Sequence, residues 1–156
     1  MVSLAKGALS TALLLGLSCA TVVRTPSGGP EPEVRLLDGS VVSWPSLLAP
    51  QGPTLVVFAT LWCDICRRER PQVEAWARAH REPRRTVYVF SGGELPAAVQ
   101  QIRTLGLDST ALTVVVDADG RLADYYAVET TPTLLVLGAQ GRVLATSHRF
   151  KSVDLD

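Results

Sequence analysis

Two cysteines, Cys63 and Cys66, are separated by Asp64 and Ile65 and carry the clearest chemistry in this sequence of 156 residues. Thiols at this spacing can close a small disulfide ring and reopen it by thiolate exchange. The apolar, β-branched run 55–60 precedes the pair, and a polar segment with apolar residues at helical intervals follows it. The pattern places both cysteines where a buried strand passes into a helix.

The start of a helix makes the two thiols unequal. Unpaired backbone amides and the helix dipole favour a thiolate there, so Cys63 is predicted to be the attacking sulfur. Cys66 lies one turn further in and is predicted to resolve the mixed disulfide. The carboxylate of Asp64 opposes a strongly lowered thiol pKa, which favours a reductant over a strong oxidant.

The pair could instead be half of a zinc site or a passive structural disulfide. A zinc ion would need two more soft ligands, and the remaining candidates, Cys19, His80 and His148, lack partner spacing. Both histidines are interpreted as surface residues. A passive disulfide would need neither the neighbouring Trp62 nor a junction between strand and helix. We therefore predict redox chemistry with no metal and no cofactor.

Residues 1–23 read as a targeting segment, with Lys6 before the apolar run 7–17 and small residues around Cys19. Three versions stay open: a lipoprotein signal with Cys19 lipidated, an uncleaved membrane anchor, or an ordinary cleaved signal. All three place the domain outside the cytoplasmic membrane, on the periplasmic side, and the first two keep it tethered. A buried N-terminal helix is the fourth interpretation.

The rest of the chain is predicted to be a proline- and glycine-containing linker, 24–33, followed by one domain, 34–156. Asp38-Gly39 predicts a hairpin turn at the start of the domain. Further strands are expected at 55–60, 86–90, 112–116, 133–137 and 142–146, and helices at 63–80, 96–105 and 121–126. Alternating strands and helices give an α/β domain with a mixed sheet.

The net charge excludes few classes of function, because 15 basic residues balance 15 acidic ones. This balance gives no reason to expect a nucleic acid as partner. The arginines at 67–85 alternate with acidic residues and are interpreted as a solvated helix face with ion pairs, docking of an acidic partner being the alternative.

The run 58–71, containing Trp62-Cys63-Asp64-Ile65-Cys66 and Pro71, together with the later Thr131-Pro132-Thr133, resembles the thioredoxin superfamily. More narrowly, it is similar to membrane-tethered extracytoplasmic proteins of the TlpA/ResA group, with an AhpC/TSA or redoxin type of domain. The resemblance covers about 34–146. It implies a thioredoxin-like fold, a mixed central sheet flanked by helices, with an N-terminal hairpin.

The same resemblance implies roles for residues outside the dithiol. Pro132 would be a cis-proline facing the cysteines, Thr131 would pair its backbone with an extended client, and Trp62 would line that contact. Glu94 would be an acidic proton relay near the sulfurs, with a helix N-terminal acid as the alternative. Val57 departs from the pattern, because cytoplasmic thioredoxins carry a buried aspartate there.

The implied activity is an extracytoplasmic thiol-disulfide oxidoreductase that reduces client protein disulfides. A membrane reductase would supply electrons, and apocytochrome c before haem attachment is a plausible client. We expect a monomer. An oxidant or isomerase is one alternative; a thiol peroxidase would need Pro-x-x-x-Thr-x-x-Cys, which is missing. A copper(I) chaperone would space its cysteines by three residues and add a nearby histidine.

Overall fold

The computed structural model describes residues 29–81, 85–107 and 109–152. The predicted signal segment with Cys19 lies outside these residues, as do residues 24–28 of the predicted linker. No helix within the described ranges combines the length and apolar character that a membrane span requires.

The strands, in chain order, are β1 (Glu33–Leu36), β2 (Val41–Ser43), β3 (Thr54–Ala59), β4 (Arg85–Ser91), β5 (Thr113–Asp117), β6 (Thr133–Leu137) and β7 (Val143–Ser147). The α-helices are α1 (Asp64–Ala79), α2 (Leu95–Thr104) and α3 (Arg121–Tyr125). Short 3-10 turns are η1 (Trp44–Leu47), η2 (Ala139–Gly141) and η3 (Phe150–Ser152).

These strands form one seven-stranded sheet in the order β2-β1-β5-β4-β3-β6-β7. Strands β3, β4 and β5 run parallel to one another, whereas β1 and β6 join them antiparallel. The sheet is therefore mixed, as predicted. Strand β3 is buried along its whole length, which explains why its sequence is a continuous apolar run rather than an alternating one.

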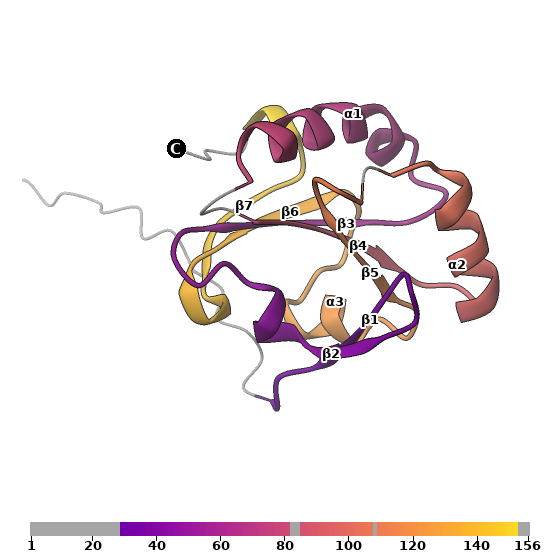
Figure 1. Ribbon diagram of the computed structural model, residues 1–156, viewed down its shortest axis with the longest axis horizontal. Coiled ribbons are helices and arrows are strands. Elements are labelled where there is room, and N and C mark those ends of the chain that lie inside the picture. Colours follow the sequence, from indigo (N-terminus) through magenta and orange to yellow (C-terminus); the bar gives the residue numbers. More distant parts are fainter. Residues whose placement is uncertain (1–28, 82–84, 108, 153–156) are drawn as a thin grey trace, which may run out of the picture.

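Helices cover both faces of the sheet, giving three layers (Figure 1). Helices α1 and α2 pack on one face, through Cys66, Val73 and Ile102 among others. Turn η1 and helix α3 cover the opposite face, where Trp44 and Tyr126 belong to the second core cluster. Successive β3 residues point alternately into the two clusters, so a single strand joins both cores.

The N-terminal hairpin is confirmed, with β1 pairing antiparallel to β2. Gly39 has a φ of 94° at the turn, and the carboxylate of Asp38 accepts hydrogen bonds from the backbone and hydroxyl of Ser40. These contacts lower the pKa of Asp38, the hydroxyl of Ser40 having the largest effect. The turn chemistry expected from Asp38-Gly39 is therefore present.

The first helical turn of the domain is η1, which begins at Trp44 with Pro45 in its first turn. The Trp44 indole N–H donates to the Tyr126 hydroxyl at 2.8 Å, and that hydroxyl donates to the Gly141 carbonyl at 3.2 Å. Burial raises the pKa of Tyr126 to about 12, so its hydroxyl keeps the proton it donates.

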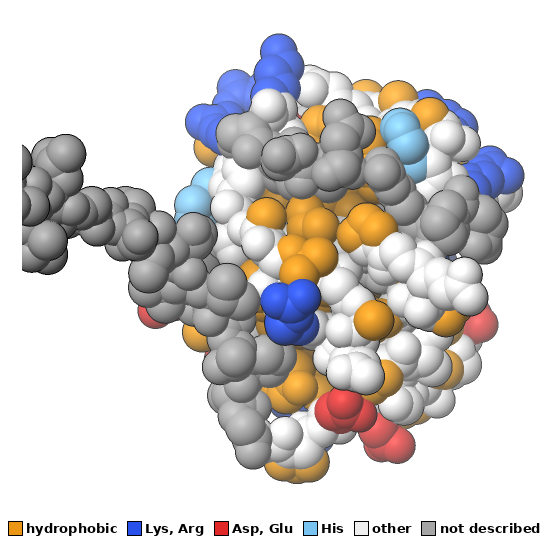
Figure 2. Space-filling view, turned by 90° about the vertical axis from the view of Figure 1, so that its left-hand side faces the viewer, with side chains coloured by type: hydrophobic (Ala, Val, Ile, Leu, Met, Phe, Trp, Pro, Cys, Tyr) orange, Lys and Arg blue, Asp and Glu red, His pale blue; other side chains and the backbone are white. Residues whose placement is uncertain are grey.

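Figure 2 looks at the left-hand side of Figure 1 and shows hydrophobic side chains near the middle of that face. Charged side chains of both signs lie mostly toward its edge. This face therefore presents no single strong charge, in keeping with the balanced composition.

Candidate active site

The site lies at the carboxyl end of β3. The two strands paired with β3, β4 and β6, bring segments that are distant in sequence to this end of the strand. Phe58 pairs with Thr133 at the start of β6, and Ala59 pairs with Phe90 of β4. The residue after β3, Thr60, has its hydroxyl 3.3 Å from that of Thr131. Segments more than 70 residues apart in sequence thus meet where the dithiol begins.

Cys63 is the N-cap residue of α1 and forms a disulfide with Cys66. The Cys66 backbone N–H donates to the Cys63 sulfur at 3.1 Å. Cys66 is buried, whereas Cys63 is half-buried. The predicted junction between strand and helix is therefore present, and the more accessible sulfur is the one that faces the helix N-terminus.

The negative charge of the Asp64 carboxylate is partly balanced by a neighbouring guanidinium. The Arg67 guanidinium lies 2.8 Å from the Asp64 carboxylate, and both side chains are well exposed. An exposed ion pair of this kind is screened by water. Asp64 still places its carboxylate beside Cys63, but less net negative charge faces the sulfur than the sequence alone indicated.

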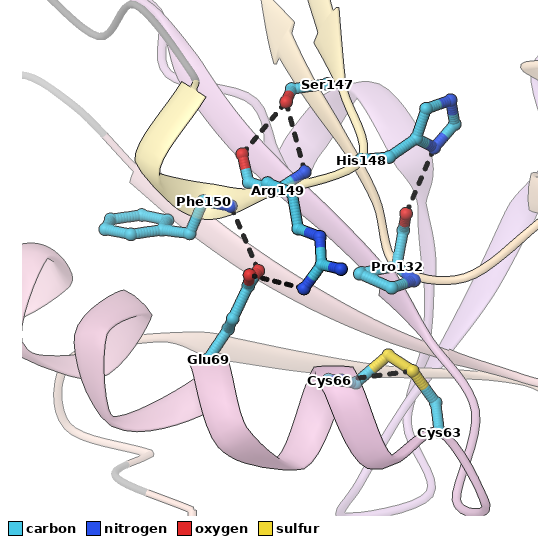
Figure 3. A network of polar contacts seen from close by, with 8 residues as sticks. All are labelled: Cys63, Cys66, Glu69, Pro132, Ser147, His148, Arg149 and Phe150. Carbon is cyan, nitrogen blue, oxygen red and sulfur yellow. Dashed lines mark hydrogen bonds and ion pairs between the residues drawn. A yellow bond between two sulfur atoms is a disulfide. The ribbon is translucent and has the colours of Figure 1, made fainter.

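Thr131-Pro132 is a cis peptide bond, and Pro132 lies opposite the disulfide (Figure 3). Trp62 is 69% exposed beside Cys63. Its ring lies against the turn after β4, where a Cβ added to Gly92 would be 3.6 Å from the indole. Gly92 also has a φ of 83°, so both its conformation and its closeness to Trp62 suit glycine.

Glu94 occupies the N-cap position of α2, two residues beyond the glycine that contacts Trp62. Its side chain is exposed and makes no capping hydrogen bond. No hydrogen bond between Glu94 and either cysteine occurs in the described part of the chain. Its role as a proton relay stays a prediction.

The ion pairs predicted for the arginine-rich helix face are present, but Arg70 is less solvated than Arg67, its side chain being 23% exposed against 59%. The Arg70 Nε and the Glu74 Oε1 are 3.6 Å apart and buried, without a hydrogen bond within the described structure. Arg70 and Tyr88 line a small cavity of about 20 Å³ together with both cysteines. Burial raises the pKa of Tyr88 to about 12. The Arg70 side chain is therefore partly buried and lines the same small cavity as both cysteines.

His148 also reaches the site, although its sequence context gave no sign of this. The side chain is exposed, as expected, yet its Nδ1 lies 3.2 Å from the Pro132 carbonyl (Figure 3). His80 is half-buried and stacks on Trp76, with ring centroids 4.6 Å apart. The described residues contain no group of three or more metal-ligating side chains.

This fold and its dithiol define a thiol-disulfide oxidoreductase of the thioredoxin superfamily. Residues 29–146 match the AhpC/TSA family, and the chain belongs to this family. It is similar to sporulation thiol-disulfide oxidoreductase A of Bacillus subtilis, with 27% identity over 116 residues that cover 72% of this chain and 67% of the relative.

Two solved structures are similar over most of their length. One is DsbF of Mycobacterium tuberculosis, with 25% identity, a TM-score of 0.65, and coverage of 77% of this chain and 86% of the other. The other is the exposed lipoprotein thioredoxin Etrx1 of Streptococcus pneumoniae, with 25% identity, a TM-score of 0.63, and coverage of 78% and 90%. These likenesses confirm the predicted thioredoxin-like fold.

Removing the carboxylate beside Cys63 tests the electrostatics of the site. We expect Asp64→Asn to lower the pKa of the reduced Cys63 thiol by about 0.2 to 0.7 unit, since exposed charges near a helix N-terminus contribute about 0.3–1 kcal/mol. The measurement is the pH dependence of Cys63 alkylation by iodoacetamide in a Cys66→Ser background.

Asp119→Asn is the matched control, because Asp119 forms an equally short, exposed ion pair with Arg121 at 2.8 Å. It should leave the thiol pKa unchanged. An Asp64→Asn shift no larger than that of the control would contradict the proposed influence of the carboxylate.

Proposed function

We propose that this protein reduces disulfides of client proteins outside the cytoplasm, with Cys63 as the attacking sulfur. The observation that carries the proposal is the position of Cys63. Its sulfur caps α1, accepts the Cys66 N–H and is the more accessible of the pair. Opposite it, the backbone around Thr131 and Pro132 offers an edge for an extended client segment.

The proposed reaction transfers two electrons in two exchange steps. The Cys63 thiolate attacks one sulfur of the client disulfide, so that a mixed disulfide forms and one client thiolate leaves. The Cys66 thiolate then attacks the Cys63 sulfur, which closes the Cys63–Cys66 disulfide and releases the second client thiolate. The client gains two electrons and two protons, and the chain ends oxidised.

The residues between the cysteines favour electron transfer from the dithiol to the client. Neither Asp64 nor Ile65 supplies the positive charge or the imidazole that would strongly stabilise a Cys63 thiolate. A less stabilised thiolate means a less stable reduced form, and hence a lower reduction potential. Arg67 pairs with Asp64 and offsets part of its negative charge, but the carboxylate still disfavours a Cys63 thiolate.

A reductant in an oxidising compartment needs a dedicated electron source. We propose a membrane reductase of the dithiol type as that donor, with a tether through lipid on Cys19 or through residues 1–23 holding the domain on the periplasmic side. Residues 24–31 would act as the spacer, since the Pro32 carbonyl accepts the Trp44 N–H and Glu33 begins β1. The similar pneumococcal protein Etrx1 is an exposed lipoprotein thioredoxin, which supports a tethered arrangement here. Apocytochrome c is the proposed client.

Glu94 is the proposed proton relay, since Val57 leaves the buried position beneath the dithiol without a carboxylate. The turn after β4 brings Gly92 against Trp62, so the start of α2 lies on the active-site side of the sheet. In the reduced protein, a carboxyl group there would accept the proton that a cysteine thiol loses.

Equilibration with a dithiol standard of known potential tests the proposed direction. We expect a reduction potential nearer the thioredoxin value of about −270 mV than the strong oxidants' value of about −120 mV. Insulin reduction by the dithiothreitol-recycled protein should accompany it, and Cys63→Ser should abolish that activity. A potential near the strong oxidants would overturn the reductant and favour the oxidant.

Glu94→Gln tests the relay. We expect a fall in insulin reduction of about 100-fold, the lower end of what general acid–base catalysis contributes, and a loss of one limb of the pH profile. Glu33→Gln is the control, since Glu33 is an exposed carboxylate at the start of β1. If Glu94→Gln and Glu33→Gln have the same activity and pH profile, Glu94 is only a helix N-terminal acid.

Labelling with a palmitate analogue in a bacterial host tests the tether. We expect label on the wild type and on Cys63→Ser, and none on Cys19→Ala. An unlabelled chain that stays in the membrane fraction would support an uncleaved anchor instead. An unlabelled chain released from the membrane would show an ordinary cleaved signal and contradict the tether.

A further inference from the structure

The stretch from Ser147, the last residue of β7, to Phe150 connects two parts of the active site. We name this stretch, Ser147–Phe150, the bridge segment. The Ser147 hydroxyl donates to the Arg149 carbonyl at 2.9 Å and accepts the Arg149 backbone N–H at 3.1 Å. The segment is thus held in a tight local turn rather than continuing along the sheet.

On one side the bridge segment contacts α1. Glu69 lies one helical turn beyond Cys66, and its carboxylate is 15% exposed. It accepts the Phe150 backbone N–H at 3.0 Å and lies 3.5 Å from the Arg149 guanidinium (Figure 3). The helix that carries the dithiol is therefore fixed to the bridge segment.

On the other side the bridge segment contacts the cis-proline loop through His148. The ring Nδ1 is 3.2 Å from the Pro132 carbonyl oxygen and 3.2 Å from the Thr133 hydroxyl. The Thr133 hydroxyl has one proton, which it donates to the Thr130 carbonyl at 2.7 Å. It can therefore only accept from His148, and the Pro132 carbonyl is an acceptor as well.

Both partners being acceptors, Nδ1 must carry a hydrogen that the two oxygens share. The neutral Nδ1–H tautomer and the imidazolium both meet this requirement, so the contact survives in either charge state. In effect, His148 fixes the orientation of the peptide unit between Pro132 and Thr133.

We infer that His148 is a positioning residue for client binding: its ring holds the Pro132 carbonyl so that the Thr131 backbone is presented to an extended client opposite Cys63. The inference rests on the proposed pairing of Thr131 with clients. His148 does not touch the sulfurs in Figure 3 and is held apart from them by Pro132. Its contribution should therefore appear with peptide substrates and not with small disulfides.

The test compares a protein disulfide, insulin, with a small disulfide that has no peptide backbone, hydroxyethyl disulfide, using the full chain. We expect His148→Ala to lower kcat/KM for insulin about 3- to 10-fold, the effect of losing one hydrogen bond, mainly through KM. The rate with hydroxyethyl disulfide should stay within about twofold of wild type, since no backbone pairing is involved.

Two further variants separate positioning from a general loss of structure. His148→Asn places an amide N–H near the position of Nδ1 and should restore most of the insulin activity. Lys151→Ala is the control from the adjacent turn η3, because Lys151 is exposed and its removal leaves the His148 contacts and both contacts of Glu69 with the bridge segment in place. It should resemble wild type with both substrates.

Equal losses with insulin and hydroxyethyl disulfide in His148→Ala would overturn the inference, because they would place the effect on the dithiol itself. So would wild-type insulin kinetics in His148→Ala, or a folded His148→Asn that is as slow as His148→Ala. The same variants are also tested as oxidants, with a reduced dithiol peptide as electron donor. If the wild type oxidises this peptide but does not reduce insulin, the proposed reductant function is contradicted. The comparison of His148→Ala with wild type in peptide oxidation still tests the role of His148.

Discussion

The pairing of β3 with its two neighbours is the constraint on which the rest of the site depends. Strand β3 is buried on both faces and hydrogen-bonded on both sides, so its register cannot shift without exposing one of the two cores. Its parallel neighbour β4 ends in the turn beneath Trp62, and its antiparallel neighbour β6 begins just after Pro132. The carboxyl end of β3 is consequently the one place where dithiol, tryptophan and cis-proline loop can meet.

The electrostatics of the dithiol result from several small effects of opposite sign. The N-terminus of α1 and the Cys66 N–H favour a Cys63 thiolate, while the adjacent Asp64 disfavours it. Arg67 offsets part of that carboxylate, and Arg70 lines the small cavity next to both sulfurs. No single group dominates, which agrees better with a moderate reduction potential than with that of a strong oxidant.

Most of the fold could be predicted from local pattern, because each buried strand is a short apolar run and each turn carries its glycine or proline. The dithiol was visible in the spacing of Cys63 and Cys66, whereas the place of Thr131-Pro132 in the site followed only from the resemblance to the thioredoxin superfamily. The contacts of His148 could not be predicted, because Pro132 and Thr133 lie 16 and 15 residues away and no local pattern links them to the ring. The partial burial of Arg70 could not be predicted either, because an arginine between charged neighbours looks solvated until the packing around α1 is known.

The central claim is that Cys63 attacks the client and Cys66 resolves the intermediate. Trapping of the mixed disulfide tests this most directly. Every chain also carries Cys19→Ala, so that each variant keeps a single cysteine, either Cys63 or Cys66. Reduced Cys66→Ser is incubated with oxidised insulin and analysed by mass spectrometry without reductant. The account predicts a stable adduct of one insulin molecule on Cys63, released by dithiothreitol, and little or none with Cys63→Ser. An adduct that accumulates on Cys66 in Cys63→Ser, but not on Cys63 in Cys66→Ser, would contradict it.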